Sequence, residues 1–587
     1  MSDESSKGAP VSDEPSEDAE ESGDKLSSSG QEKQGVKFSP ERFQDNYRRV
    51  ADIGEGRRWY DLPYRVVSWL LSSRMRRVVR PQKLRERLAY LSTYLAVFND
   101  HERNKKWDLD DPLHNVRVPP QEHVHMPGIW VVELFPPSQF SSLDQAIRKG
   151  DWDRHRRWIY DGRDNRRYLE LSRSGKGWSW WRLADIAQKG SKIWLADSTR
   201  EDLPEAFETV QLKAVQIGAG LTAVVAFFRL TDTAARRLDR VWHEKHEPRL
   251  AFGKGLPRAE DRQWASFRLT QKARRALHDA ARRWMAERCP GYFSSYSEPQ
   301  PLLDLLLMNE FDPTKGERVD RELADALRAI GFTGDLLHTT SSDLPGILLS
   351  PVDGELCRAL EGKRTWGLWG NRKVLAAIPG YLEGRGNDVD HAIAHVADDR
   401  IRSFSVILAI SGFLEIAESE YAKLRDSARA RHHTFKASRL NYLRRSLLTL
   451  SLDLTSVARD VQEFWKRNWR EAHDIEFIVD QAPWISQEDQ ALGRERFEAT
   501  SMTSELRERQ HKWFDKLITA DRDYRDILST VAALGASADT YKISRVALWA
   551  AIASLAIAAV TLLFAEVKDQ NVLSALLSWL KRVLEAQ

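Results

Sequence analysis

The chain has 587 residues, of which 42% are hydrophobic and 30% charged, a composition ordinary for globular domains. A net charge of +3 argues against a protein that binds nucleic acid over its whole surface, so no nucleic-acid partner is favoured. Two cysteines exclude a disulfide framework, and the N-terminus lacks a basic start followed by an apolar core. We therefore expect no signal peptide and a soluble bulk in the cytoplasm.

The first segment, residues 1–40, consists largely of Ser, Glu, Asp and Gly, with ten acidic residues against four lysines. Such a segment cannot bury enough apolar surface to offset the entropy lost on ordering. We predict a disordered acidic tail.

The charge then inverts, with twelve basic against four acidic residues from Arg48 to Arg87. Residues 64–79 have the pattern of an amphipathic helix, which Pro81 ends. Its end carries a cluster of four arginines, Arg74, Arg76, Arg77 and Arg80. Three interpretations stay open for this helix: packing on its own domain, contact with anionic lipid headgroups, and contact with nucleic acid. The second makes the four arginines candidates for membrane-surface contact.

Residues 41–385 mix strand and helix patterns, which predicts an α+β or α/β cytoplasmic domain with a mixed sheet. The clearest signal is a hairpin of residues 207–217 and 221–230, joined by Gly218-Ala219-Gly220. Proline-rich residues 100–127 predict a loop. Further strands are expected at 128–135, 301–308, 346–349 and 373–378, and helices at 142–149, 232–245 and 270–288.

Residues 386–545 change to a helical period of about 3.5. The strongest apolar seam is Leu440, Leu443, Leu447, Leu450, Leu454, Val457, Val461 and Phe464. A weaker seam precedes it, and a third helix begins near Ser501 with no later proline to end it. We predict a long antiparallel, coiled-coil-like helical stalk.

Residues 546–565 carry no charged side chain, and only Ser554 and Thr561 are clearly polar. A helix of this length is about 30 Å long, the thickness of a bilayer's hydrocarbon core. We predict a single-pass transmembrane helix in the cell (inner or plasma) membrane, with the lipid bilayer as a partner. The small residues Ala550, Ser554 and Ala558 recur every four positions, which favours self-association of this helix in a homo-oligomer.

Residues 566–587 follow the predicted span and have an apolar run too short to cross a bilayer. They predict an amphipathic helix that lies on the far membrane surface or packs against copies of itself.

Candidate chemistry is sparse, because the sequence contains no phosphate-binding loop, G-x-S-x-G, C-x-x-C or H-E-x-x-H motif. His391 and His395 lie four residues apart at a helix start, where they are candidate ligands of a metal, against a solvated helix start. Weaker pairs are His123 with His125 and His243 with His246, and residues 353–363 faintly resemble a nuclease-type acid and E-x-K set. We predict no cofactor and no catalytic residue.

A cytoplasmic α/β domain, long helices and a C-terminal membrane helix together resemble the CorA-type metal-ion transporters, over roughly the last 350 residues. That family has two membrane helices and a Gly-Met-Asn motif after the first. Here Phe564 is followed by Ala565-Glu566-Val567 and no second span is present, so neither ion selectivity nor pore residues carry over.

The expected function is a membrane-tethered cytoplasmic interaction or sensor protein that acts as an oligomer on an unknown protein partner. One alternative is an oligomeric channel or pore-forming effector, and another is a membrane-anchored enzyme without a readable motif. Tethering is favoured over conduction because a span with two polar side chains offers poor lining for an ion path.

Overall fold

The computed structural model describes residues 61–71, 81–107, 116–154, 164–175, 180–191, 198–244, 249–251, 258–260, 262–315, 321–332, 337–352, 364–383, 388–429, 437–466, 475–495, 497–564, 566–567 and 570–585. The chain divides into two compact units, residues 1–88 and 89–587. The predicted acidic tail, the four arginines from Arg74 to Arg80 and the segment 353–363 lie outside the described residues.

The described part of the predicted amphipathic helix is α2, Asp61–Leu71. Its side chains Leu62, Val66 and Trp69 are exposed. The next helix, α3, spans Gln82–Trp107, and strand β1 begins at Val124, so the loop expected at 100–127 was wrong over its first eight and its last four residues. The physical reason is that neither proline nor glycine interrupts residues 82–107, and the first proline after them is Pro112.

An 11-stranded mixed sheet forms the centre of the second unit, in the order β13-β12-β9-β10-β11-β8-β1-β5-β4-β2-β3. Its strands are β1 Val124–Phe135, β2 Trp180–Gln188, β3 Thr199–Glu201, β4 Phe207–Gln216, β5 Thr222–Leu230, β8 Leu302–Met308, β9 Leu337–Thr340, β10 Ile347–Pro351, β11 Thr365–Asn371, β12 Ile478–Gln481 and β13 Thr500–Ser501. The pairs β8/β11 and β2/β3 are parallel, and the other pairs are antiparallel. The predicted mixed sheet and the β4–β5 hairpin are confirmed. The sheet draws strands from both sides of residue 385.

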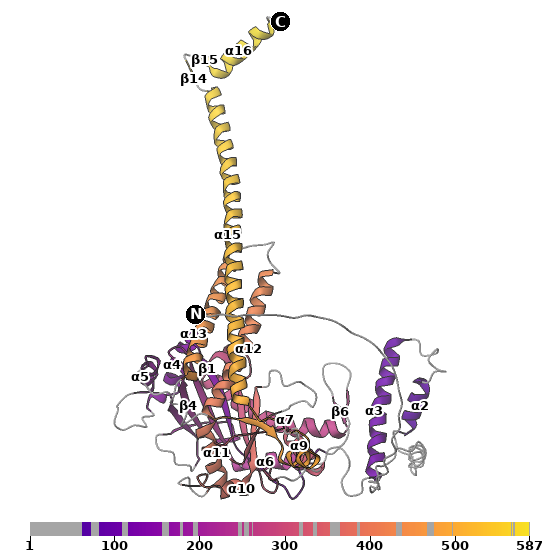
Figure 1. Ribbon diagram of the computed structural model, residues 1–587. Coiled ribbons are helices and arrows are strands. Elements are labelled where there is room, and N and C mark those ends of the chain that lie inside the picture. The colour runs from indigo at the N-terminus through magenta and orange to yellow at the C-terminus, as the bar shows by residue number, and fades with distance from the viewer. Residues whose placement is uncertain are drawn as a thin grey trace, which may run out of the picture. The chain divides into compact units, whose positions relative to one another are not determined.

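Helices cover both faces of this sheet (Figure 1). Successive side chains of β1 point to opposite faces of the sheet. Trp130 and Val132 belong to the hydrophobic core on one face, and Ile129 and Val131 belong to the core on the other. The first core includes α8 Tyr292–Ser295, α11 Val389–Arg400, α12 Arg402–Arg429 and α13 Ala437–Lys466. The second includes α4 Phe140–Lys149, α5 Asn165–Arg173, α6 Asp232–His243, α7 Arg262–Arg288 and α9 Arg321–Ile330.

Most of the local predictions are confirmed, and one strand was wrong. Of residues 373–378, expected as a strand, 373–377 belong to helix α10, Arg372–Ala377. The side chain of Asn371 accepts a hydrogen bond from the backbone N–H of Val374 at 3.0 Å, which caps the helix where the strand β11 ends. Smaller elements are η2 Pro137–Gln139, η3 Trp152–Arg154, β6 Arg249–Ala251, β7 Arg258–Glu260 and α14 Pro483–Leu492.

The helices α12, α13 and α15, Met502–Phe564, contact one another. The carboxylate of Asp521 on α15 joins all three helices, because it accepts hydrogen bonds from Tyr421 Oη on α12 and Ser451 Oγ on α13, each at 2.9 Å. The predicted helices are present; the coiled-coil-like stalk stays a prediction.

The helix α13 is also bound to the sheet. The carboxylate of Asp460 accepts the backbone N–H groups of Gly220 and Leu221, at 2.5 and 3.0 Å, in the β4–β5 turn. A Cβ atom at Gly218 would lie 2.4 Å from the side chain of Asp460, so this turn needs glycine for the helix to approach. Asp453 binds the backbone N–H of Ser138 at 3.0 Å and its hydroxyl.

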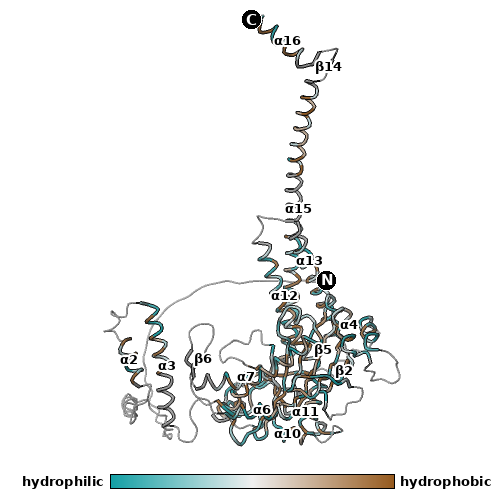
Figure 2. The backbone as a smooth tube through the Cα atoms, turned by 180° about the vertical axis from the view of Figure 1, so that it is seen from behind, coloured by the Kyte–Doolittle hydropathy of each residue, from teal (hydrophilic) through white to brown (hydrophobic). Residues whose placement is uncertain are grey.

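The helix α15 continues for 63 residues. Its segment Ile543–Thr561 is the one part of the described chain that is long and apolar enough to cross a membrane, and it is fully exposed (Figure 2). Two short strands, β14 Glu566–Val567 and β15 Gln570–Asn571, then pair with each other before α16, Val572–Glu585, which confirms a helix after the apolar segment.

Candidate functional site

A polar cavity of about 340 Å³ lies where β5 and β11 end and β1 begins. The carboxyl ends of strands in open α/β sheets are the usual place for ligands, because loops and helix starts meet there. Twelve residues line the cavity: His125, Met126, Pro127, Arg229, Leu230, Asp232, Ala235, Arg236, Arg372, Asp388, Asp390 and His391.

Two helix starts, those of α6 and α11, contribute to this cavity. The hydroxyl of Thr231 caps α6 by accepting the backbone N–H of Ala234 at 3.2 Å. The carboxylate of Asp388 caps α11 by accepting the backbone N–H of His391 at 3.1 Å. Because a helix start carries partial positive charge, it stabilises anionic groups nearby, whether side chains or ligand atoms.

Ion pairs hold the charged groups of the cavity in place. The guanidinium of Arg229 contacts Asp388 at 2.7 Å and Glu208 at 3.4 Å. The carboxylate of Asp390 pairs with Arg372 and lies 3.4 Å from Nδ1 of His125. These paired charges line a cavity suited to a small polar ligand that carries both donors and acceptors.

His391 faces this cavity from the first turn of α11. Burial, and next the positive charge of Arg229, lower the pKa of His391 to about 4, so its imidazole is neutral at pH 7. Its Nδ1 atom is buried and has no hydrogen-bond partner within the described residues. The neutral imidazole ring of His391 lines the cavity, where it can donate or accept a hydrogen bond with a ligand.

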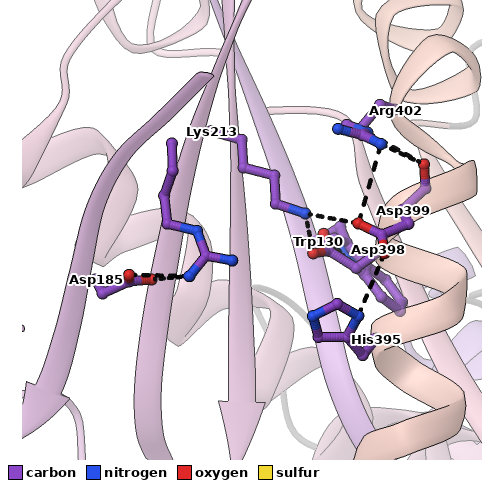
Figure 3. A network of polar contacts seen from close by, with 8 residues as sticks. Trp130, Asp185, Lys213, His395, Asp398, Asp399 and Arg402 are labelled. Carbon is purple, nitrogen blue, oxygen red and sulfur yellow. Dashed lines mark hydrogen bonds and ion pairs between the residues drawn. The ribbon is translucent and has the colours of Figure 1, made fainter. Parts of the chain in front are cut away.

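The last turn of α11 is anchored to the sheet by a buried ion pair (Figure 3). Nζ of Lys213 on β4 pairs with the carboxylate of Asp398, and both side chains are at most 3% exposed. The indole N–H of Trp130 on β1 donates to the same carboxylate at 3.0 Å. One helix therefore lines the cavity at its start and is bound to two central strands at its end.

His395 belongs to this anchor rather than to the cavity lining. Its Nδ1 lies 3.3 Å from the carboxylate of Asp399, which also lies 3.6 Å from Nζ of Lys213. The hydrogen bond from His395 and the positive charges of Lys213 and Arg402 lower the pKa of Asp399 despite its burial. The predicted metal pair is therefore divided: His391 lines the cavity, His395 lies beside Asp399, and the ring centroids are 6.4 Å apart.

A second cluster lies beside the cavity, where α6 contacts β1. Within the part of the chain that the structure describes, the histidines and carboxylates close enough to share one ion are His123, Asp239 and His243. The sequence patterns included His123 and His243 only in separate weak pairs, and Asp239 in none. A helical repeat places Asp239 and His243 on one side of α6, and this was the available signal for the pairing.

Of the residues predicted to contact the membrane, the structure describes Ala550, Ser554 and Ala558 but not the four arginines from Arg74 to Arg80. Ala550, Ser554 and Ala558 lie on the exposed apolar segment of α15.

No family model matches the sequence, and neither the curated proteins nor the solved structures contain a match to it. Function is therefore inferred from the geometry alone.

Proposed function

We propose that this protein is a membrane-tethered interaction or sensor protein, whose α/β domain binds a small polar ligand in the cavity at the strand ends. The observation that carries the proposal is the continuity of α15. Near its start, Phe514 and Leu517 are 3% and 2% exposed within the core of the domain. Further along the same helix, the apolar segment Ile543–Thr561 is fully exposed.

An exposed apolar segment of this length needs a partner, since soluble proteins rarely leave such a surface in water. A bilayer supplies one that matches both its length and its lack of charge. The helical stalk of α12, α13 and α15 would then hold the domain at the membrane, on the cytoplasmic side.

Self-association of the span completes the proposal. In lipid, helices gain no hydrophobic energy by pairing, so close backbone approach over small residues favours contact. Ala550, Ser554 and Ala558 provide such positions at a spacing of four. A homo-oligomer would present several copies of the cavity to one partner.

Membrane tethering is tested by placing charge in the span. In the double variant Ile552→Arg, Leu555→Arg, each arginine disfavours insertion by about 3 kcal/mol at the centre of a helix. We expect the unaltered protein to stay in the membrane pellet after alkaline carbonate extraction, and the double variant to become soluble. Ile527→Arg is the matched control, because Ile527 is an exposed residue of the same helix outside the apolar segment. Release of the unaltered protein from the membrane into the soluble fraction by alkaline carbonate would refute the proposal.

The cytoplasmic side is tested by cysteine labelling of intact cells. A cysteine introduced at Gln587 should react with an impermeant reagent, and one introduced at Ser28 should not. Both native cysteines are first replaced with alanine, because Cys289 is buried and Cys357 lies outside the described residues. The opposite labelling pattern would reverse the proposed orientation.

A further inference from the structure

The cluster of His123, Asp239 and His243 combines three groups that bind metals. Nδ1 of His123 lies 2.9 Å from Oδ2 of Asp239, and Nε2 of His243 lies 3.3 Å from Oδ1 of the same carboxylate. One candidate ligand atom from each residue lies within 4.8 Å of the others. The imidazole rings are at 69° to each other with centroids 5.5 Å apart, so they do not stack.

The contacts of His243 place its second ring nitrogen, Nε2, against a carboxylate. Nδ1 of His243 lies 3.0 Å from the carbonyl oxygen of Val118, and this contact is favourable only if Nδ1 carries a hydrogen. In the neutral ring, Nε2 then has a lone pair that faces the carboxylate of Asp239. Nε2 is buried and makes no hydrogen bond within the described residues. A proton or a metal ion bound between the two groups would remove this repulsion.

We propose that His123, Asp239 and His243 bind one divalent transition-metal ion of the zinc type. Two imidazole nitrogens and one carboxylate oxygen are a donor set that suits Zn²⁺. Three protein ligands leave one tetrahedral position for water or for a donor atom of a ligand. This site is independent of the proposed function and does not depend on membrane tethering.

The groups around the cluster orient its ligands as metal sites require. A ligand histidine usually donates its other ring N–H to a carbonyl or carboxylate, as His243 does to Val118. The carboxylate of Asp239 is oriented by the backbone N–H of Val124 at 2.9 Å. The segment that carries His123 is held by Glu122, whose buried carboxylate accepts backbone N–H groups of His123, Asn309, Glu310 and Phe311.

The cluster is accessible and lies beside the cavity. The side chain of His123 is 53% exposed, which gives an ion a path from solvent. On α6, Asp232 and Arg236 line the cavity, and Asp239 and His243 follow at helical spacing on the same side. The carboxylate of Asp239 raises the pKa of His243, so it attracts an added proton as well as an added metal ion, and the positive charge of Arg117 opposes both.

The test is metal binding by the purified full-length protein in detergent, after treatment with a chelator. Zn²⁺ affinity is measured by competition with a chromophoric chelator, and Co²⁺ is added separately to read the absorption of a tetrahedral site. We expect one ion per chain. His123→Ala and His243→Gln should each weaken binding by about 100-fold or more, since even residues that only orient ligands contribute 10–100-fold. His511→Gln is the matched control, because His511 and Asp515 form an exposed pair on one helix.

Two results would overturn the assignment. One is the absence of saturable Zn²⁺ binding, which would leave a proton between His243 and Asp239. The other is loss of binding in a His391→Gln, His395→Gln variant with undiminished binding in His123→Ala, which would place the ion at the other histidine pair. His123→Ala decides the matter even if His243→Gln fails to fold, because the exposed ring of His123 contributes little to the core.

Discussion

Replacing Lys213 with Met tests the anchor that binds α11 to the sheet. The substitution keeps the volume of the side chain and removes its charge. It leaves the carboxylate of Asp398, which is 2% exposed, with the indole N–H of Trp130 as its remaining close donor. Breaking a buried ion pair on one side usually costs about 3–5 kcal/mol, because the other charge stays buried without its partner.

The loss of unfolding free energy caused by this substitution has an upper limit that depends on pH. The stranded carboxyl of Asp398 can take up a proton instead of staying ionised. At pH 7 and an ordinary Asp pKa near 3.9, protonation costs about 4 kcal/mol. We therefore expect a loss of about 3–4 kcal/mol in the free energy of unfolding at pH 7. Because taking up a proton becomes easier as the pH falls, the loss should shrink by up to about 1.4 kcal/mol for each unit that the pH falls toward 5.

Urea unfolding of the detergent-solubilised protein, followed by tryptophan fluorescence at pH 7 and pH 5, measures both effects. Lys423→Met is the matched control, since Lys423 pairs with Glu420 at the surface and should contribute little. A deficit for Lys213→Met below about 1 kcal/mol at pH 7, or an equal deficit at both pH values, would refute the burial argument.

Three further predictions concern other parts of the chain. Acidification should destabilise the protein as the pH falls from about 6.5 toward 4, because the folded pKa of His391 is lowered to about 4; His391→Gln should remove this component in a pH series of melts. Asp521→Ala should cost at least about 2 kcal/mol by urea unfolding, because Tyr421 and Ser451 lose their shared acceptor. Ser554→Leu with Ala558→Leu should give smaller assemblies by native-size measurement in nanodiscs, whereas a monomeric unaltered protein would contradict self-association.

Local rules predicted many elements of the fold. The hairpin of β4 and β5 follows from two β-rich apolar runs around a Gly-Ala-Gly turn, and the helix α6 follows from a Thr cap. The strand expected at 373–378 was wrong because the prediction followed the apolar and β-branched residues of this segment. It did not take account of Asn371, whose side chain caps a helix and whose position is visible in the sequence. On α15, Asp521 interrupts the apolar spacing of Phe514, Leu517 and Tyr524. Its hydroxyl partners on α12 and α13 explain this polar residue, and only the tertiary structure supplies them.

The candidate sites could be predicted only in fragments. His391 was singled out from its helical spacing, and it lines the cavity. Its charged neighbours Arg229 and Arg372 come from different strand ends, and sheet order alone brings them together. Likewise, His123 and Asp239 are more than a hundred residues apart and meet only because α6 packs beside β1. The spacing of residues in the sequence predicts which side chains are neighbours within one helix or strand. It does not predict contacts between elements that the fold brings together.

The anchor on α11 also distinguishes two forms of the proposed function. A sensor that signalled by displacing the whole helix would have to break the buried pair of Lys213 and Asp398, at a cost of about 3–5 kcal/mol. A ligand can shift an equilibrium only by its differential affinity for the two states, so it would need at least a hundredfold preference for the displaced state. Separating Arg229 from the half-exposed Asp388 at the other end of α11 costs about 1 kcal/mol or less. The easier response is therefore local to the cavity, which favours a ligand-dependent interaction surface with α15 as its tether over a signal carried through α11.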